Sequence, residues 1–366
     1  MLHILFASRL VHEKWVDILI EAIRYFHSRE WSQDIHWDIC SDGEYENTIR
    51  DLAREYKNVT YHGKISKEAL NTLYEKSDVL FMPSRFLEMF GLTALEALEH
   101  GTPVIWPRKW WLRDLISESY SLDENNPITS LEKILVELIK WEELPVTDIR
   151  DFSHEAWTTR ITKLIEKDKN IAIIHDYEEK IWWAEYYIAF LREQIKNLWK
   201  NVSLHAYRGK TTPWKRRIMF VLSLIAFWRG IALWKGLRET QPTLIWLHSI
   251  LRYMWPWWAL AVRHYQRKTW ARIILCHHDL GLLAAFPQDI TSESMIPEST
   301  RLTDFIPKYT SLTKKIISIG KWCYVRLILS LLGKNIEHMV FASFLIPYVQ
   351  KQAKKEDIIL FPHTSL

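Results

Sequence analysis

The sequence predicts an α/β protein that consists of two Rossmann-like domains, each built on a doubly wound parallel sheet. Two observations predict this fold. Short β-branched or apolar runs alternate with longer amphipathic runs, as in proteins with parallel sheets. A polar run at residues 166–170 separates two such series in a chain of 366 residues, which is long enough to form two cores. We expect domains at about 1–168 and 169–366.

Each expected strand is short and apolar, and each expected helix carries apolar residues at helical spacing. In the first half, strands are expected at 4–7, 35–40, 59–62, 79–82 and 103–105. Helices are expected at 15–27, 44–56, 67–76, 93–100, 130–141 and 153–167. In the second half, strands are expected at 171–175, 202–207, 244–248, 273–277, 339–342 and 358–361, with a helix at 184–198.

The charge and the cysteines narrow the class of protein. The formal net charge is +4 and the basic residues are dispersed, which suits an anionic small molecule or loose contact with an acidic membrane surface, and no nucleic-acid partner is expected. Cys40, Cys276 and Cys323 lie far apart, so neither a disulfide framework nor a zinc site is expected. The N-terminus does not resemble a signal peptide. We expect a cytoplasmic protein that can touch the inner face of the membrane peripherally.

Two glutamates, Glu88 and Glu96, stand eight positions apart after an expected strand. In an open α/β sheet, ligands bind beyond the carboxyl ends of the strands, which is where this segment would lie. A carboxylate accepts two hydrogen bonds in a fixed geometry, so it suits sugar hydroxyls. Gly91 would let the backbone come close to a ligand, and the helix start at Leu92 and Thr93 would offer free N–H groups to phosphate oxygens.

Two cations, Arg9 and Lys14, follow the first expected strand and precede the first expected helix. Cations at this place can clamp a diphosphate. Together with the two glutamates, they point to an anionic ligand that also carries hydroxyl groups.

The motifs around these residues follow one another in order: SRLVHEKW, SDGEY, NVTYHGKI, SDVLFMPS and EMFGLTALEALEHGTPVI. This series, over about residues 3–168, resembles the nucleotide-sugar-binding domain of family 4 glycosyltransferases, which have the GT-B fold. The resemblance implies a retaining, metal-independent hexosyltransferase that uses a UDP- or GDP-sugar as donor and needs no cofactor. It implies that Arg9 and Lys14 hold the pyrophosphate of the donor. It also implies that Glu88 is a catalytic-site residue that holds the hydroxyls of the donor sugar, and that Glu96 holds the ribose of the nucleotide.

The second half resembles the acceptor-binding half of the same family, which normally comes first in the chain. The run IAIIHDYEEKIWWAE places Trp182 and Trp183 where the family has two glycines at the donor diphosphate. His278 falls where many members carry a histidine beside the reacting sugar, so a catalytic-site role is expected. His175 and His248 are expected to be structural. The implied acceptor is a glycan or a lipid-linked sugar.

The inverted domain order has three explanations. The chain is circularly permuted, or it joins the end of one glycosyltransferase to the start of another, or it is a partial reading of a longer tandem enzyme. A GT-B active site lies in the cleft between domains, so in the last two cases each half would lack its cognate partner.

Tryptophan is unusually frequent, with 20 Trp against 10 Gly. Many of these residues stand where the family has glycine: Trp15, Trp106, Trp110, Trp111, Trp182, Trp183 and Trp199. Such positions need positive φ or close backbone approach, which glycine supplies without strain. One hypothesis is that many of these residues are glycines misread in translation of the gene, since Gly and Trp codons differ by one base. Trp157 is expected to be a genuine aromatic residue.

The alternative hypothesis is that the tryptophans are real. They would then serve as membrane-interface anchors near Trp255, Trp257 and Trp258. The chain would be a glycosyltransferase-derived binding or scaffold protein whose donor cleft is blocked by indole rings.

Overall fold

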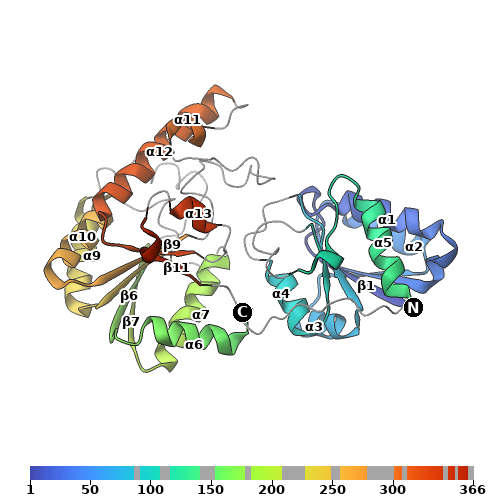
Figure 1. The fold of residues 1–366 in the computed structure, drawn as a ribbon, viewed down its shortest axis with the longest axis horizontal. Helices are drawn as coiled ribbons and strands as arrows, with labels where there is room; N and C mark the ends of the chain where they lie inside the picture. Colours follow the sequence, from blue (N-terminus) through green and yellow to red (C-terminus); the bar gives the residue numbers. More distant parts are fainter. Residues whose placement is uncertain are drawn as a thin grey trace. The chain divides into compact units, whose positions relative to one another are not determined.

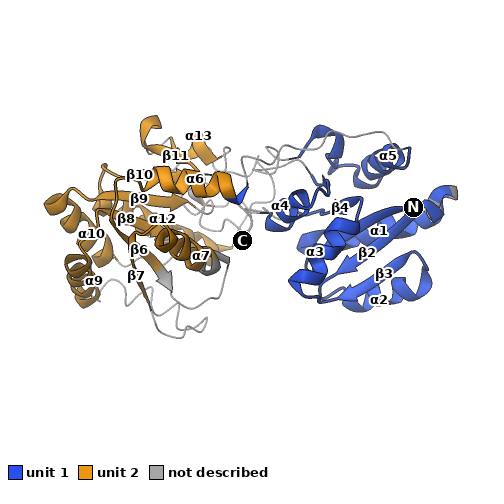
Figure 2. Cartoon of the chain, turned by 90° about the horizontal axis from the view of Figure 1, so that it is seen from below, with its two compact units in different colours: residues 1–154, 290–293, 365 blue, residues 155–289, 294–364, 366 orange. Residues whose placement is uncertain are grey.

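The structure, a computed structural model, shows two compact α/β units (Figure 1). It describes residues 1–85, 91–107, 116–140, 153–177, 183–207, 227–248, 256–277, 301–306, 311–340, 345–350 and 353–361. The first unit contains residues 1–154, and the described residues from 155 onward form the second (Figure 2). Each unit is built on a parallel sheet, so the predicted fold class is confirmed.

The first unit has the strand order β3-β2-β1-β4-β5 with every neighbouring pair parallel. Its strands are β1 (Leu2–Ala7), β2 (Ile35–Cys40), β3 (Val59–Gly63), β4 (Val79–Phe81) and β5 (Val104–Ile105). Its helices are α1 (Val16–His27), α2 (Glu46–Glu55), α3 (Lys67–Lys76), α4 (Leu92–Glu99) and α5 (Pro127–Ile139). The expected elements of this half are confirmed, with small differences at their ends.

The burial pattern explains why these runs fold as they do. In α1, Leu19, Ile23 and Phe26 recur at helical spacing and are buried on one face. The Phe26 ring stacks on Trp37 of β2, with 6.4 Å between ring centroids. Strand β1 is instead apolar and buried without a break from Ile4 to Ala7, as expected for a central strand that is covered on both faces.

The second unit has the strand order β11-β10-β9-β8-β6-β7, again with parallel neighbours. Its strands are β6 (Asn170–Tyr177), β7 (Asn201–Tyr207), β8 (Leu244–His248), β9 (Arg272–His277), β10 (Glu337–Val340) and β11 (Ile358–Leu360). Its helices are α6 (His154–Leu164), α7 (Trp183–Asn197), α9 (Phe227–Thr240), α10 (Pro256–Thr269), α11 (Leu302–Phe305), α12 (Leu312–Leu332) and α13 (Ile346–Val349).

The two units divide between His154 and Glu155, and not after residue 168 as expected. The reason is the packing of α6. Its buried residues Trp157 and Ile161 belong to the same core cluster as Tyr187 of α7 and the strands of the second sheet. Trp157 is fully buried, which is consistent with its interpretation as a genuine aromatic residue.

The tryptophans that were considered as membrane anchors are only partly described. Trp258 of α10 is 7% exposed and packs in the core cluster that contains Tyr324 and Ile328 of α12. It is therefore not an exposed anchor, whereas Trp255 lies outside the described residues. Among the described helices, none combines the length and the apolar character that a bilayer-spanning segment requires.

A buried histidine pair joins two strands of the second unit. His277 Nε2 of β9 lies 2.8 Å from His338 Nδ1 of β10, and the two rings are parallel. Burial lowers the pKa of His338 to about 4, and burial and the neighbouring His338 lower the pKa of His277 well below its ordinary value. One ring therefore donates and the other accepts, with both neutral at physiological pH.

This pair is expected to make the second unit sensitive to acid. Below the ordinary histidine pKa of about 6.5, these histidines are protonated in the unfolded chain but remain neutral in the folded one. The free energy of unfolding therefore falls as the pH drops from about 6.5 to about 4. For His338 alone the loss would reach about 3 kcal/mol. Thermal unfolding measured across this pH range should show a shallower slope for His338→Asn than for the unaltered chain. Equal slopes would contradict the assignment.

Candidate donor site at the switch point of the first sheet

The strand order of the first unit reverses direction between β1 and β4, which lie side by side at the centre of the sheet. In open α/β sheets the loops at the carboxyl ends of such strands form the ligand crevice. Arg9 and Lys14 lie in the connection after β1, which includes a 3-10 turn at His12–Lys14. Gly91, at the start of α4, closes the connection after β4. The structure thus brings these two sets of predicted residues to one edge of the sheet.

The loop after β1 is held by backbone hydrogen bonds to the loop after β2. The N–H of Leu10 donates to the carbonyl of Asp42 at 2.8 Å, and the N–H of Tyr45 donates to the carbonyl of Leu10 at 3.0 Å. Between these contacts lies Gly43, with φ +152°, where an added Cβ would lie 2.4 Å from the Leu10 carbonyl oxygen. Only glycine permits this approach, so the position of Arg9 depends on Gly43.

The connection after β4 is tied to the start of α1 by Arg85. Its backbone N–H donates to the carbonyl of Glu13 at 3.0 Å. Its guanidinium donates to both carboxylate oxygens of Asp17, each at 2.6 Å, and lies 5.3 Å from the centroid of the Trp15 ring. The hydrogen bond from Arg85 lowers the pKa of Asp17. These contacts join the connection after β4 to Glu13 and to the first turn of α1, through a residue that the sequence motifs did not single out.

The start of α4 has the geometry expected of an anion-binding helix end. Gly91 is the residue before the first turn and adopts the left-handed conformation, with φ 47°. Leu92 and Thr93 follow in the first turn, where backbone N–H groups have no partner within the helix. These groups can donate to phosphate oxygens, and the helix dipole favours negative charge there.

Glu96 of α4 is held in place by two side chains of α3. Lys67 forms an ion pair with one carboxylate oxygen, and the hydroxyl of Tyr74 donates to the other at 3.3 Å. Tyr74 is fully buried, and burial together with Glu96 raises its pKa, so the hydroxyl remains a donor. The carboxylate is therefore fixed by these two contacts, with remaining lone pairs available to ligand hydroxyls. Lys67 and Tyr74 were not singled out from the sequence, although both lie in the helix that was expected at 67–76.

The remaining predicted site residues are only partly placed. Glu88, His278 and Trp182 lie outside the described residues. Trp183 is the first residue of α7, and its side chain is not among those described. These positions stay predictions from the resemblance.

His248 ends β8 and pairs in register with His175 of β6, and both residues are buried. The Nδ1 atom of His175 lies 3.1 Å from the carbonyl oxygen of His248, to which it can donate. Their burial and this contact agree with the structural role expected of both residues.

The backbone conformation separates the tryptophans that stand at expected glycine positions. Trp15 (φ 52°) and Trp199 (φ 59°) adopt the left-handed conformation, as does Trp270 (φ 59°), which the motifs did not reveal. Trp199 and Trp270 each follow the last turn of a helix, where glycine is the usual residue. Trp106 does not share this conformation and is buried at the end of β5. Trp110 and Trp111 lie outside the described residues.

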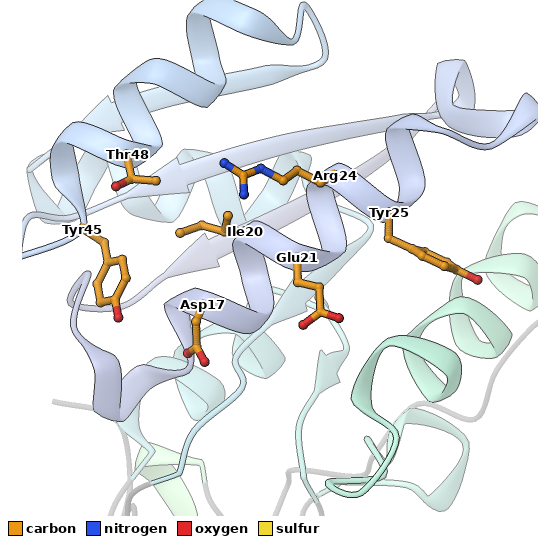
Figure 3. Close-up of a pocket in the computed structure, with 7 residues that line it drawn as sticks. All are labelled: Asp17, Ile20, Glu21, Arg24, Tyr25, Tyr45 and Thr48. Atoms are coloured by element: carbon orange, nitrogen blue, oxygen red, sulfur yellow. The ribbon is translucent and has the colours of Figure 1, made fainter.

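A groove of about 610 Å³ runs along the outer face of α1, next to the start of α2 (Figure 3). It is lined by Asp17, Ile20, Glu21, Arg24, Tyr25, Tyr45 and Thr48. None of the predicted donor-site residues lines this groove, so we assign it no part in donor binding.

Known proteins resemble part of this chain. The sequence model of the family described as "Glycosyl transferases group 1" matches residues 2–145. An uncharacterized glycosyltransferase of Methanocaldococcus jannaschii, MJ1178, is 32% identical over 148 residues, which cover 39% of this chain and 40% of that protein. The glycogen synthase of Aquifex aeolicus is 29% identical over 114 residues, covering 31% of this chain and 23% of the synthase. The chain thus spans less than half the length of these relatives.

Solved structures give a weaker similarity. The catalytic domain of the cholesterol-alpha-glucosyltransferase from Helicobacter pylori matches with a TM-score of 0.30 and 19% identity, over 38% of this chain and 90% of that domain. The pneumococcal O-GlcNAc transferase GtfA, in complex with UDP and GlcNAc, matches with a TM-score of 0.33 and 23% identity, over 39% of this chain and 30% of the transferase. The family match, and not these superpositions, is the comparison with weight: residues 2–145 are similar to the domain described as "Glycosyl transferases group 1".

Proposed function

We propose that the chain is a retaining glycosyltransferase of the family 4 type, with a GT-B fold, that transfers a hexose from a UDP- or GDP-sugar to a glycan or lipid-linked acceptor. The observation that carries this proposal is the position of Arg9, Lys14, Gly91 and Glu96 at the switch point of a domain that matches glycosyltransferases. We further propose that catalysis needs neither metal nor cofactor, and that the enzyme works in the cytoplasm with peripheral membrane contact.

The chemistry follows from the charge of the leaving group. As the bond between the sugar and the nucleoside diphosphate breaks, negative charge grows on the diphosphate oxygens. Arg9 and Lys14 would neutralise this charge, and the N–H groups at the start of α4 would donate to it. Donors that are held in place before the reaction stabilise such a transition state without reorganisation cost. The hydrogen bonds that fix the loop around Leu10 supply this preorganisation.

The carboxylates would position the donor. Glu96, held by Lys67 and Tyr74, would accept hydrogen bonds from the ribose hydroxyls. Glu88 would accept hydrogen bonds from the donor sugar and keep its anomeric carbon in place. The second unit would bind the acceptor, with His278 beside the reacting sugar.

Nucleotide release from a panel of UDP- and GDP-sugars, with and without simple glycan acceptors, tests this proposal. We expect release with at least one donor and its loss in Glu88→Gln. Glu99→Gln, at the exposed end of α4, is the matched control and should retain the activity. A chain that binds donors but never releases nucleotide would favour the rival function of a binding or scaffold protein. A fusion of two half-enzymes would give the same result until a cognate partner domain is added.

We also propose that glycine is the natural residue at Trp15, Trp199 and Trp270. The support is conformational, because left-handed backbone costs a residue with a Cβ about 1–2 kcal/mol and costs glycine almost nothing. Trp199 and Trp270 are 96% and 85% exposed, so their indole rings gain little from burial in return. UGA codons at these positions, or peptide masses that correspond to glycine, would support the proposal, and UGG codons at all three would exclude it.

The stability of one variant tests the conformational argument directly. Trp199→Gly is expected to stabilise the chain by about 1 kcal/mol, because it removes the left-handed strain and loses almost no buried surface. Trp199→Ala is the control, since alanine removes the same ring but keeps the Cβ. Urea unfolding of the two variants should separate them. Equal stabilities would show that the Trp199 backbone carries no strain.

A further inference from the structure

A cluster of three histidines around one aspartate lies on the first sheet, apart from the proposed donor site. His3 belongs to β1, His36 and Asp38 to β2, and His62 to β3. In the parallel register His3 pairs with His36, and Asp38 pairs with Thr60. His3 and His36 lie at the amino ends of their strands, whereas the donor site lies at the carboxyl ends. The cluster therefore has no part in the proposed transfer reaction.

The register of the sheet gathers these side chains on one face. His36 and Asp38 are two positions apart, so they point to the same side of β2. The register between β2 and β3 shifts after the pair of Ile39 and Tyr61, because Cys40 pairs with Gly63 and not with His62. Such a bulge re-aims the side chain of the extra residue. Here it brings the Nε2 atom of His62 to 2.7 Å from Asp38 Oδ1.

The distances fit a tetrahedral metal ion. His3 Nδ1 lies 3.4 Å from Asp38 Oδ2, and His36 Nε2 lies 3.7 Å from Asp38 Oδ1. The ligand atoms of His3, His36 and Asp38 all lie within 4.8 Å of one another. Two ligand atoms bound to one tetrahedral zinc ion at about 2.0–2.1 Å are separated by about 3.3 Å, so the carboxylate and the two rings need to move only slightly to share an ion.

The donor set and its surroundings select the class of metal. Imidazole nitrogens combined with one carboxylate suit Zn²⁺ and its first-row neighbours better than Mg²⁺ or Ca²⁺, which prefer oxygen ligands. Asp38 is 8% exposed, so its charge is largely withdrawn from water, while the His3 side chain is 35% exposed and leaves a route for the ion. His62 can donate to the carboxylate and orient it, as the outer partners of metal ligands do.

We propose that His3, His36 and Asp38 bind one zinc ion and that His62 positions the Asp38 carboxylate. The ion would join β1 to β2 and stabilise the first unit, with its fourth position left to water. The hydroxyl of Thr60, 3.0 Å from His36 Nε2, would give up that contact when the ring binds the ion. The proposal is independent of the transferase function.

Metal binding by the full chain without a histidine tag tests the proposal. After treatment with a chelator, titration with ZnCl₂ is expected to show one tightly bound equivalent and a rise in the melting temperature. CoCl₂ should give the intense visible bands of a tetrahedral complex with nitrogen and oxygen ligands. His3→Gln and His36→Gln are each expected to lower the affinity at least 100-fold, and His62→Gln about 10-fold through the loss of orientation.

The matched control is His154→Gln, which changes an exposed histidine of α6 and should bind zinc as the unaltered chain does. Circular dichroism shows whether each variant is folded, and if His36→Gln does not fold, the half-exposed His3 provides the decisive variant. No saturable zinc binding by the unaltered chain would overturn the proposal and leave the cluster a hydrogen-bonded network. Unchanged affinity in both His3→Gln and His36→Gln would overturn it as well.

Discussion

Replacing Arg9 by alanine is expected to reduce turnover of the nucleotide sugar about 100-fold, the effect found when one preorganised donor to a developing charge is removed. Arg9 is exposed in the loop after β1, so its side chain is not needed for the core. Lys14→Ala should have a similar effect, because both cations are proposed to face the same diphosphate. The measurement is the rate of nucleotide release at saturating donor, together with a check of folding by circular dichroism.

The control for Arg9→Ala is Arg54→Ala, which removes an exposed arginine of α2 that pairs with Asp51 on the same helix. Both variants lower the net charge equally, so a general electrostatic effect on an anionic donor would appear in both. Loss of turnover in Arg9→Ala alone would locate the effect at the switch point. Near-normal rates in both Arg9→Ala and Lys14→Ala would refute the assignment of the diphosphate site.

Gly43→Ala is expected to damage both stability and donor binding, although Gly43 is not proposed to touch the donor. A Cβ at this position would lie 2.4 Å from the carbonyl oxygen and 2.9 Å from the amide nitrogen of Leu10, so the two loops must move apart. Overpacking and backbone strain of this kind cost about 2 kcal/mol or more. The loop that carries Arg9 would move with Leu10, and the donor should bind about 10-fold more weakly. Urea unfolding and calorimetric titration with the nucleotide measure the two effects.

The variant Gly101→Ala tests the effect of left-handed backbone strain without the close contact that a Cβ would make at Gly43. Gly101 also has positive φ, at +80°, but nothing lies within 4 Å of an added Cβ. We therefore expect a loss of about 1 kcal/mol from left-handed strain alone and no change in donor binding. If Gly43→Ala resembled Gly101→Ala in both measurements, the contact between the two loops would not control the site.

The strands could be predicted from the sequence because burial decides them. Four-residue apolar runs, Ile4 to Ala7 in β1 and Leu244 to Leu247 in β8, mark these strands as buried on both faces. The place of α6 could not be predicted in the same way. Its amphipathic pattern requires a buried face but does not say which of two sheets will cover it, and Trp157 packs in the second core.

Sequence motifs identified the candidate residues that directly follow strands. They did not reveal contacts between residues that are distant in the sequence. Arg9 follows β1 and Gly91 ends the connection after β4, and the strand order of this doubly wound sheet places these two strands side by side. The contact between Arg85 and Asp17 joins residues 68 positions apart, and no local spacing signals it. The histidine cluster is a stronger case, because a one-residue bulge at His62 completes it.

The hypothesis that tryptophans stand at glycine positions stays a prediction, and the structure describes the backbone at only some of these residues. The motifs indicated glycine-like positions at Trp15 and Trp199, and both have the left-handed backbone that such positions require. Trp106 does not, so resemblance to a glycine-containing motif alone does not identify a strained residue. Trp270 was missed because the resemblance supplied no motif there, while its position after the last turn of α10 was a usable signal.

Calorimetric titration of the full chain with UDP and GDP tests the central claim most directly, because the claim is that the switch point of the first unit binds a nucleoside diphosphate. We expect saturable heat with one of the two nucleotides, and an affinity at least 10-fold weaker in Arg9→Ala but unchanged in Arg54→Ala. The absence of heat with both nucleotides, or equal affinities in all three proteins, would contradict the claim.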